Sequence, residues 1–328
     1  TDLKIPPVTG MTYRLYYLSK RLSEENVDVK IFVCNRNIRN KNDEKLLYEK
    51  SQLEFHILPE NVFYAPEKIK SIIEKNHIDI LQFEDSVSVL RYKTIYKDLQ
   101  IPVCLEIHDV ESSLKEMLNF SEDNIKITKK ISYNACVLAN EVICMTPLDY
   151  SELIHKIGVD KEKLTLIPNP INLKDFQFFG PNLKSDNIIF IGNMYYWPNR
   201  DAALIIIKEI VPNVLKSNKN VKFHFIGMVP EELKKNENEN IIFTGKINNI
   251  NHILKKSSVA LCPVYAGSGM KVKLLNYCAA GIPIITTSIG SSGYEKVRSL
   301  LIEDDISNYS NIIISLLRDK KKKLKLGK

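Results

Sequence analysis

The sequence predicts an α/β fold made of two doubly wound domains, each with a parallel sheet between layers of helices. Short β-branched, apolar runs alternate with longer amphipathic stretches along the whole chain. The short runs are apolar at successive positions, which is typical of strands buried on both faces of a parallel sheet. The alternation occurs twice, on either side of a polar segment with Gly180 and Pro181. A chain of 328 residues is also longer than a single hydrophobic core usually supports, so two domains are expected.

The expected strands of the first half are VDVKIFVC (27–34), LEFHILP (53–59), IDILQFE (78–84), VCLEIHD (103–109), EVICMT (141–146) and LTLIPN (164–169). Those of the second half are NIIFIGN (187–193), VKFHFIG (221–227), NIIFTGK (240–246), VALCPVY (259–265) and IPIITT (282–287). Helical patterns between them include TYRLYYLSKRLSEEN (12–26), PEKIKSIIEKN (66–76), RDAALIIIKEIVPNVLKSN (200–218) and VKLLNYCAAG (272–281). We place the domain boundary after residue 178, which gives domains of residues 1–178 and 179–328.

Composition fits an ordinary globular protein, with 44% hydrophobic and 26% charged residues. No apolar run approaches the roughly 20 residues that a membrane-spanning helix needs. The six cysteines are scattered without a CxxC pair, so we expect free thiols in a reducing, cytoplasmic compartment. The chain begins at Thr1 rather than Met, and we expect an upstream strand to be missing.

The formal net charge of +7 is concentrated in the second half, above all in the lysine-rich tail after Arg318. A charge run of this kind is usually a solvated helix end. No aromatic side chains that could stack on bases are interleaved with it, so a nucleic-acid partner is not expected. A peripheral contact with the membrane stays open as an alternative.

The most informative segment is AGSGMKVKLLNYCAAGIPIITTSIGSSGYE, residues 266–295. A strand ends there in a loop with Gly267 and Gly269, and a helix is expected to begin near Lys271. Glycines let backbone N–H groups approach an anion, and the helix N-terminus adds partial positive charge. Lys271 and Lys273 add two cations, so the segment is suited to a diphosphate. A tight strand-to-helix turn with two surface lysines is the alternative.

Two further positions are candidates for contacts with a ligand. Asn276 follows one helical turn beyond the loop and could direct its amide toward a ribose, although it could equally be an ordinary polar residue within a helix. His108 closes the strand VCLEI. A lone histidine is more often a core residue, but a polar loop follows this one at the carboxyl end of a strand, where ligands bind α/β sheets.

At this point a resemblance becomes specific. GSGMKVKLLNYCAAGIPIITTSIGSSGYE resembles the donor-site signature of group 1 glycosyltransferases, G-x-G-x-[RK]-x-K-x-L-E-x-x-A-x-G-x-P-V-V-x-T-x-x-G-x-x-G. Four other segments resemble family segments in order, namely PPVTGMTYRLYYLSKRLSEENVDVKIFV, LEIHDVESSLKEML, IPNPINLKDF and IGNMYYWPNRDAALIIIKEIVP. The resemblance implies the GT-B fold, in which two Rossmann-like domains face a central cleft. Residues 1–178 would form the acceptor side, and residues 179–328 would bind the donor.

The resemblance also implies roles for individual residues. His108 would be the catalytic residue that hydrogen-bonds the transferred sugar. The donor-binding residues would be Gly10, Gly269, Met270, Lys271, Lys273 and Asn276. Gly10 would lie against the donor phosphates, the two lysines would neutralise them, and Asn276 would stand where the family usually has a glutamate on the ribose. Many relatives carry a second glutamate eight positions earlier, where this chain has Ser268.

The implied activity is transfer of a sugar, with retention, from a UDP-, GDP- or ADP-sugar to a glycan or lipid-linked acceptor in surface polysaccharide synthesis. No cofactor or metal is expected, and the sequence has no Asp-x-Asp motif. The expected location is the cytoplasm, with the inner face of the membrane as an alternative. The family normally ends in a helix that crosses back onto the first domain, and we expect this helix to be missing. The alternative functions are those of a catalytically weak donor-binding subunit, or of an epimerase or a phosphorylase on the same fold.

Overall fold

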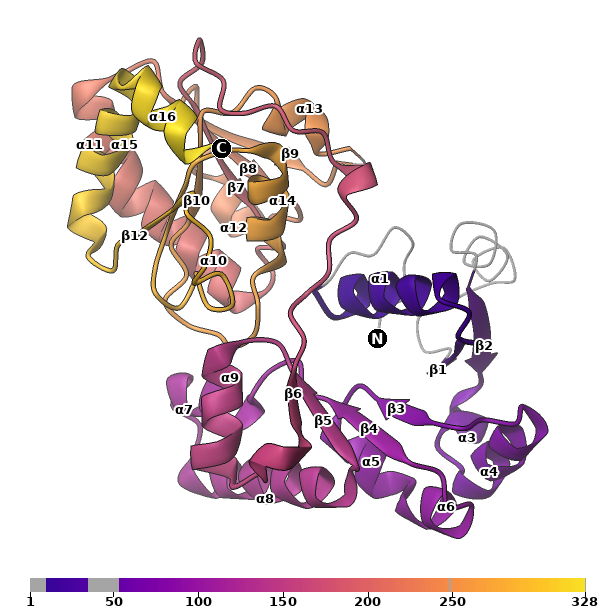
Figure 1. Cartoon of the computed structure of the whole chain (residues 1–328). Coiled ribbons are helices and arrows are strands. Elements are labelled where there is room, and N and C mark those ends of the chain that lie inside the picture. The colour runs from indigo at the N-terminus through magenta and orange to yellow at the C-terminus, as the bar shows by residue number, and fades with distance from the viewer. Residues whose placement is uncertain (1–9, 35–52, 248, 328) are drawn as a thin grey trace. The chain divides into compact units, whose positions relative to one another are not determined.

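The computed structural model describes residues 10–34, 53–247 and 249–327, and the chain divides into two units, Thr1–Ile171 and Asn172–Lys328 (Figure 1). Each unit is an α/β unit in which every described strand pairs in parallel, so the predicted fold class is confirmed. Across these residues, no helix is both long and apolar enough to cross a membrane.

The described strands of the first unit form two parallel sheets. A pair is made of β1 (Lys30–Cys34) and β2 (Glu54–Leu58), with Ile31 opposite Phe55. The other sheet has its strands in chain order, β3 (Leu81–Phe83), β4 (Val103–Glu106), β5 (Glu141–Cys144) and β6 (Leu164–Leu166). The helices are α1 (Gly10–Glu24), α3 (Glu60–Phe63), α4 (Pro66–Lys75), α5 (Ser86–Arg91), α6 (Lys93–Asp98), α7 (Glu111–Met117), α8 (Glu122–Leu138) and α9 (Pro147–Glu152), which continues as a π-helix over Leu153–Ile157.

The second unit contains a six-stranded parallel sheet with the order β12-β11-β10-β7-β8-β9. Its strands are β7 (Asn187–Ile191), β8 (Lys222–Ile226), β9 (Ile241–Gly245), β10 (Val259–Cys262), β11 (Ile284–Thr286) and β12 (Leu300–Ile302). The chain winds outward from β7 in one direction and then returns to continue from β10 in the other. The carboxyl ends of β7 and β10 therefore form a topological switch point, where doubly wound sheets bind ligands.

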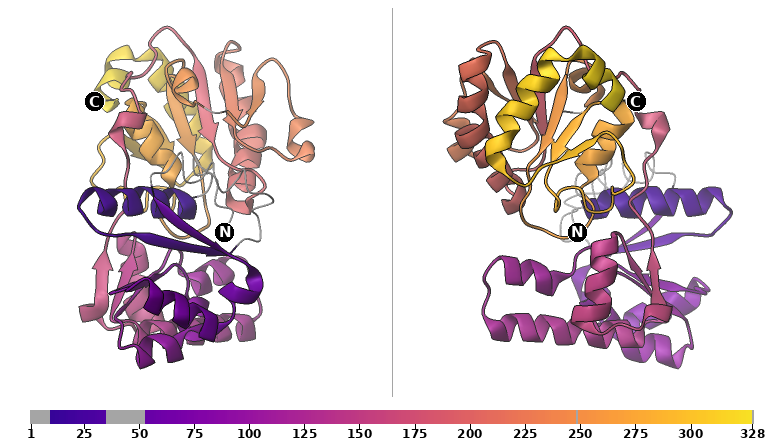
Figure 2. Two further views of the ribbon diagram at one scale, coloured as in Figure 1. Left: turned by 90° about the vertical axis from the view of Figure 1, so that its right-hand side faces the viewer. Right: turned by 60° about the vertical axis from the view of Figure 1, so that its left-hand side comes forward.

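Helices cover both faces of this sheet (Figure 2). They are α10 (Trp197–Ile205), α11 (Val211–Ser217), α12 (Glu231–Lys234), α13 (Asn251–Leu254), α14 (Val272–Ala280), α15 (Tyr309–Arg318) and α16 (Lys320–Leu326). The helix predicted over 200–218 is interrupted by a π-helical turn at Ile206–Ile210. Pro212 lies two residues after this turn, and because proline has no N–H it cannot continue the α-helical ladder at that point.

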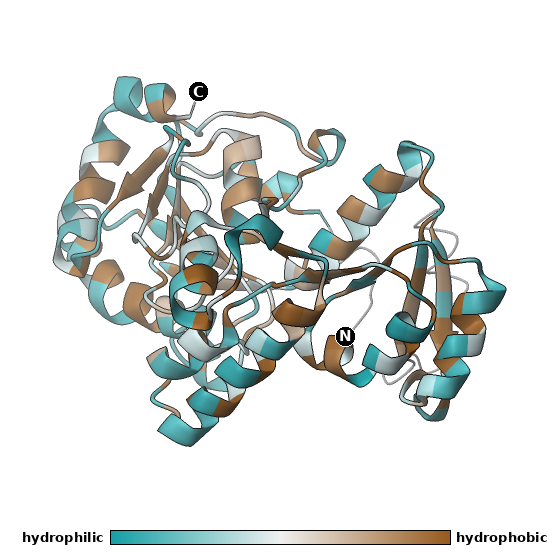
Figure 3. Ribbon diagram, turned by 60° about the horizontal axis from the view of Figure 1, so that its bottom comes forward, coloured by the Kyte–Doolittle hydropathy of each residue, from teal (hydrophilic) through white to brown (hydrophobic). Residues whose placement is uncertain are grey.

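Hydropathy explains the layering in both units. The strands are apolar almost throughout, whereas the helices carry an apolar stripe on one side only (Figure 3). Val142 and Leu105 in the first unit, and Leu261 and Ile285 in the second, are completely buried. β10 and β11 are buried at every position, and strands that bury both faces read as continuous apolar runs. All eleven expected strands are present. β12 was not among the predicted strands.

The segment that follows residue 172 is fastened to the second unit. Phe176 and Phe179 pack against its core. The backbone N–H groups of Phe179 and Gly180 both donate to Ala280 O, at 3.1 and 2.9 Å. A Cβ atom on Gly281 would collide with the Phe178 ring and would lie 2.7 Å from the backbone oxygen of Gly327, so only glycine fits this contact. These contacts explain why the second unit begins at Asn172, before the boundary that we placed after residue 178.

Candidate active site

The glycine loop of the second unit joins β10 to α14 at the switch point. Gly267 has φ +110° and Gly269 has φ +69°, both in the region that disfavours side chains. α14 begins at Val272 with Lys271 as its N-cap, which confirms the predicted helix start. Tyr294 Oη donates a 2.8 Å hydrogen bond to Lys271 O and thereby ties the loop to a later segment. The loop therefore presents backbone and a helix N-terminus at the carboxyl edge of the sheet.

Lys271 folds back over its own loop. Its Nζ donates to Ser268 O at 2.8 Å and to Gly269 O at 3.0 Å, and the side chain is half-buried. An ammonium group has three donor hydrogens, so Lys271 can hold the loop and still offer charge to an anion. Met270, the residue before it, packs partly buried against the core of the unit.

Lys273 is one of two lysines that are almost completely buried among the described residues of the second unit, the other being Lys323 of α16. Lys273 is only 9% exposed. Its Nζ donates a hydrogen bond to Asn199 Oδ1 at 2.6 Å and lies 4.3 Å from the centroid of the Phe190 ring. The ion pairs described in this unit, Arg200–Glu232 and Lys234–Glu231, do not involve it. Burial lowers the pKa of Lys273 to about 8. Its described partners are thus neutral, although buried charges normally pair with a counter-ion.

Asn276 lies further along α14 and is half-buried. Among the described residues, its Oδ1 is buried and has no hydrogen-bond partner. A buried amide oxygen without a donor is costly, and a ligand hydroxyl would satisfy it. Its position one turn after Lys273 agrees with the predicted spacing on one helix face.

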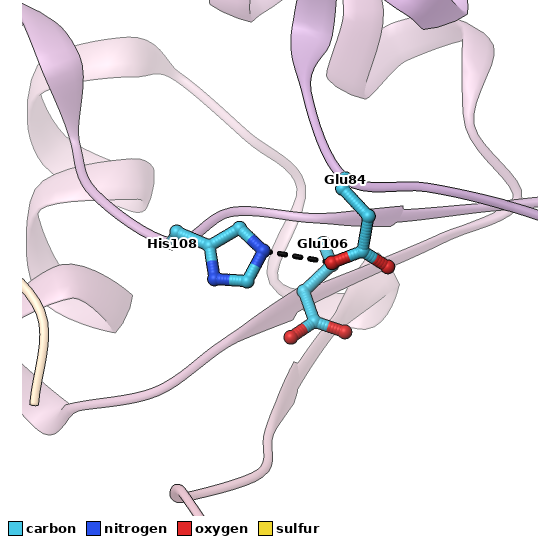
Figure 4. A group of neighbouring side chains, drawn as sticks. All are labelled: Glu84, Glu106 and His108. Carbon is cyan, nitrogen blue, oxygen red and sulfur yellow. Dashed lines mark hydrogen bonds and ion pairs between the residues drawn. The ribbon is translucent and has the colours of Figure 1, made fainter. Parts of the chain in front are cut away.

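The first unit contains the other candidate, His108, directly after β4. Its side chain is 10% exposed, and Nε2 lies 2.8 Å from Glu84 Oε2. Glu84 follows β3, and Glu106 is the last residue of β4, so both carboxylates stand at the same sheet edge as the histidine (Figure 4). Gln82 Nε2 bridges them, donating to Glu106 Oε2 at 2.7 Å and to Glu84 Oε1 at 2.9 Å.

Arg14 of α1 completes this network by its contact with Glu106. It is fully buried, forms an ion pair with Glu106 and donates from Nη1 to Pro168 O at 2.8 Å. Burial raises the pKa of Glu106, and the charge of Glu84 raises it further, whereas Arg14 opposes the shift. Our sequence reasoning did not identify Glu84, Glu106 or Arg14. The available signal for Glu84 was its place as the last residue of the predicted strand 78–84, directly before Asp85.

The predicted site residues therefore fall into separate groups. Gly269, Met270, Lys271, Lys273 and Asn276 share the loop and first turns of α14 in the second unit. His108 belongs to the first unit, as does Gly10, which is the exposed first residue of α1. Glu111, three residues after His108, pairs with Lys115 at 3.0 Å along α7.

Two family models cover most of the chain. The model described as "Glycosyltransferase Family 4" matches residues 8–175, and the model described as "Glycosyl transferases group 1" matches residues 185–319. Both matches place the chain in the glycosyltransferase class. The chain is a member of glycosyltransferase family 4.

Two curated relatives are similar in sequence. An uncharacterized 44.6 kDa protein in the cps region of Klebsiella pneumoniae is 27% identical over 58% of this chain and 52% of its own length. The UDP-Gal:α-D-GlcNAc-diphosphoundecaprenol α-1,3-galactosyltransferase of Escherichia coli is 22% identical over 76% of this chain and 69% of its own. The chain thus spans about half the length of the first relative.

Among solved structures, HepE of Anabaena in complex with UDP superposes with a TM-score of 0.76 at 12% identity, covering 100% of this chain and 90% of that one. Sucrose-phosphate synthase of Thermosynechococcus elongatus superposes with a TM-score of 0.74 at 15% identity, covering 98% and 87%. At such identities the likeness establishes the fold, which is GT-B.

Proposed function

We propose that this chain transfers a sugar from a nucleoside-diphosphate sugar to the hydroxyl of a glycan or lipid-linked acceptor, with retention of configuration. The donor diphosphate binds the glycine loop and the start of α14. The observation that carries this assignment is Lys273, a buried cation at the switch point whose described partners are neutral. A diphosphate would supply the missing negative charge. His108 contacts the transferred sugar.

The chemistry follows from the donor. A glycosyl diphosphate already carries its leaving group, so the protein has to stabilise the departing charge and position the acceptor hydroxyl. Lys271, Lys273 and the N-terminus of α14 can perform the first task. Members of this family use nucleotide-sugar donors and need no metal. We assign Gly10 to the donor phosphates and Asn276 to the ribose.

The relatives support a more specific proposal. The Klebsiella relative stands in a cps region, and the Escherichia coli relative is named for a UDP-sugar donor and a diphosphoundecaprenol-linked acceptor. We therefore propose a UDP-sugar donor and a lipid-linked acceptor in surface polysaccharide synthesis. We place the reaction in the cytoplasm, at the inner face of the membrane. The unpaired state of all six cysteines supports a reducing compartment.

The test is incubation of the protein with UDP-, GDP- and ADP-sugars, with and without lipid-linked acceptors, followed by mass spectrometry of all products. Acceptor-dependent release of nucleotide with a lengthened acceptor is the expected result. Two other results would contradict the proposal. Epimerised donor without acceptor would indicate an epimerase, which the carboxylates near His108 make the second candidate. Tight donor binding without any product would indicate a binding subunit.

Protonation of Lys273 should make UDP binding depend on pH. Because the pKa of Lys273 is about 8 and a bound diphosphate favours the charged form, affinity for UDP should be full near pH 7. It should then fall as pH rises through 8, by up to about tenfold per pH unit. Calorimetry from pH 7 to 9.5 measures this. Lys273→Arg, which stays charged throughout, is the control that should flatten the dependence; an equally steep dependence in this variant would contradict the assignment.

Asn276→Glu restores the residue that the family usually carries at this position. A carboxylate would accept a charge-assisted hydrogen bond from the ribose, so UDP should bind more tightly by about 1–2 kcal/mol. Repulsion between the new carboxylate and the diphosphate opposes this, but both lysines lie on the same segment and offset it. Calorimetry with UDP, and with thymidine diphosphate as a 2′-deoxy comparison, measures the gain. Loss of binding would show that Asn276 is adapted to another ligand.

A further inference from the structure

The network around His108 consists of four side chains that connect this histidine to the interior of the first unit. The Glu84 carboxylate is hydrogen-bonded to the imidazole Nε2. Gln82 donates hydrogen bonds to Glu84 and Glu106, and Glu106 forms an ion pair with the buried Arg14. Glu106 is 1% exposed and Arg14 is completely buried, whereas the Glu84 side chain retains 24% exposure. The network is therefore buried at its inner end and reaches the carboxyl edge of the sheet at Glu84 and His108.

A cation site is one possible interpretation, because single ligand atoms of Glu84, Glu106 and His108 lie within 4.8 Å of one another. The hydrogen bonds of the two carboxylates disfavour a cation site. Both oxygens of Glu106 already accept, one from Arg14 and one from Gln82. Both oxygens of Glu84 accept as well, from Gln82 and from His108. The guanidinium group also places a fixed positive charge beside the cluster, which disfavours a second cation.

We propose that Glu84 is a positioning residue that accepts the Nε2–H of His108, fixes the proton on that nitrogen, and leaves Nδ1 for the transferred sugar. Gln82 and Glu106 hold the Glu84 carboxylate in place. This inference rests on the proposed function only for the role of Nδ1. The second ring nitrogen of a functional histidine is commonly fixed in this way by a carboxylate, because the hydrogen bond selects one tautomer and one ring orientation.

The electrostatics of the surrounding groups agree with this arrangement. Burial lowers the pKa of His108, but the hydrogen bond and charge of Glu84, together with the charge of Glu106, outweigh it and leave the pKa raised. Arg14 from α1 opposes these carboxylates. A raised pKa means that the imidazole stays protonated to higher pH, and in this form Nδ1–H donates to a sugar oxygen. In neutral His108, with its proton fixed on Nε2, Nδ1 instead accepts from a sugar hydroxyl.

The experiment compares the full chain with Glu84→Gln and Glu84→Ala. Glutamine keeps the size of the side chain but removes its charge, and it can donate as well as accept, so the tautomer preference should be lost. The matched control is Glu54→Gln, because Glu54 Oε1 lies 2.7 Å from His56 Nε2 in the same unit but on β2. Long-range ¹⁵N–¹H NMR reads the tautomer and the titration of His108, with His108→Gln identifying its signals. Thermal unfolding checks that each variant folds.

In the unsubstituted protein we expect neutral His108 to carry its proton on Nε2. In Glu84→Gln its pKa should fall, kcat/KM for sugar transfer should drop by at least about tenfold, and the affinity for UDP should stay unchanged. An unchanged tautomer and pKa in both Glu84 variants would overturn the proposal, as would a changed tautomer with normal kcat/KM. If the unsubstituted protein transfers no sugar from any donor, the proposed function fails, and the NMR measurement alone decides whether Glu84 fixes His108.

Discussion

Replacing Lys271 and Lys273 together with alanine should weaken binding of UDP by about 2–4 kcal/mol, because charge-assisted hydrogen bonds are lost in a partly desolvated site. Lys273 should contribute more than Lys271, since it is the deeper of the two and its described partners are neutral. Calorimetry on the single and double variants measures both contributions. Lys273→Met fills the space that alanine would empty and so separates the lost charge from a cavity.

The control for this pair is Lys255→Ala/Lys256→Ala, which changes the net charge equally. Both lysines are exposed and precede β10, whereas the glycine loop follows the same strand at its other end. This variant should bind UDP normally. Equal affinity in the Lys271/Lys273 variant and the control would remove the glycine loop from the donor site.

His108→Ala should reduce turnover by about a hundredfold while leaving the affinity for free UDP unchanged, because UDP lacks the sugar that His108 is assigned to contact. Turnover with a UDP-sugar and calorimetry with UDP separate the two effects. His56→Ala serves as the control, since His56 also pairs with a glutamate in the first unit but belongs to β2. If His108→Ala turns over normally or does not fold, the histidine is a core residue, and the assignment to the sugar is wrong.

The fold could be predicted from sequence because its elements have strong local signatures. Buried parallel strands read as unbroken apolar runs, and each one expected is present within a few residues. β12 was missed because Leu300–Ile302 is short, lies at the sheet edge and is followed by acidic residues. The break in the long helix at Ile206–Ile210 was missed as well, although Pro212 signalled it.

The two groups of candidate residues, one in each unit, differ in how much of them the sequence reveals. The glycine loop and the start of α14 are contiguous, so their chemistry can be read from one segment. His108 contacts Glu84, which lies 24 residues earlier in the chain. Glu106 contacts Arg14, which lies 92 residues earlier. Only the folded unit brings these residues together. The burial of Lys273 was not predicted either, because it depends on Asn199, 74 residues earlier.

The attachment of residues 176–182 to the second unit bears on how members of this family can be recombined. A chimera that joins a foreign first unit at residue 178 would separate Phe176 from the core it packs on, and it would alter the partner that Gly281 is shaped to meet. A junction at Ile171–Asn172 keeps both contacts with their own sequence. The second unit, which carries the glycine loop that we propose binds the donor, thus begins before the aromatic residues Phe176 and Phe179. Packing sets this boundary, rather than the polar composition of the segment.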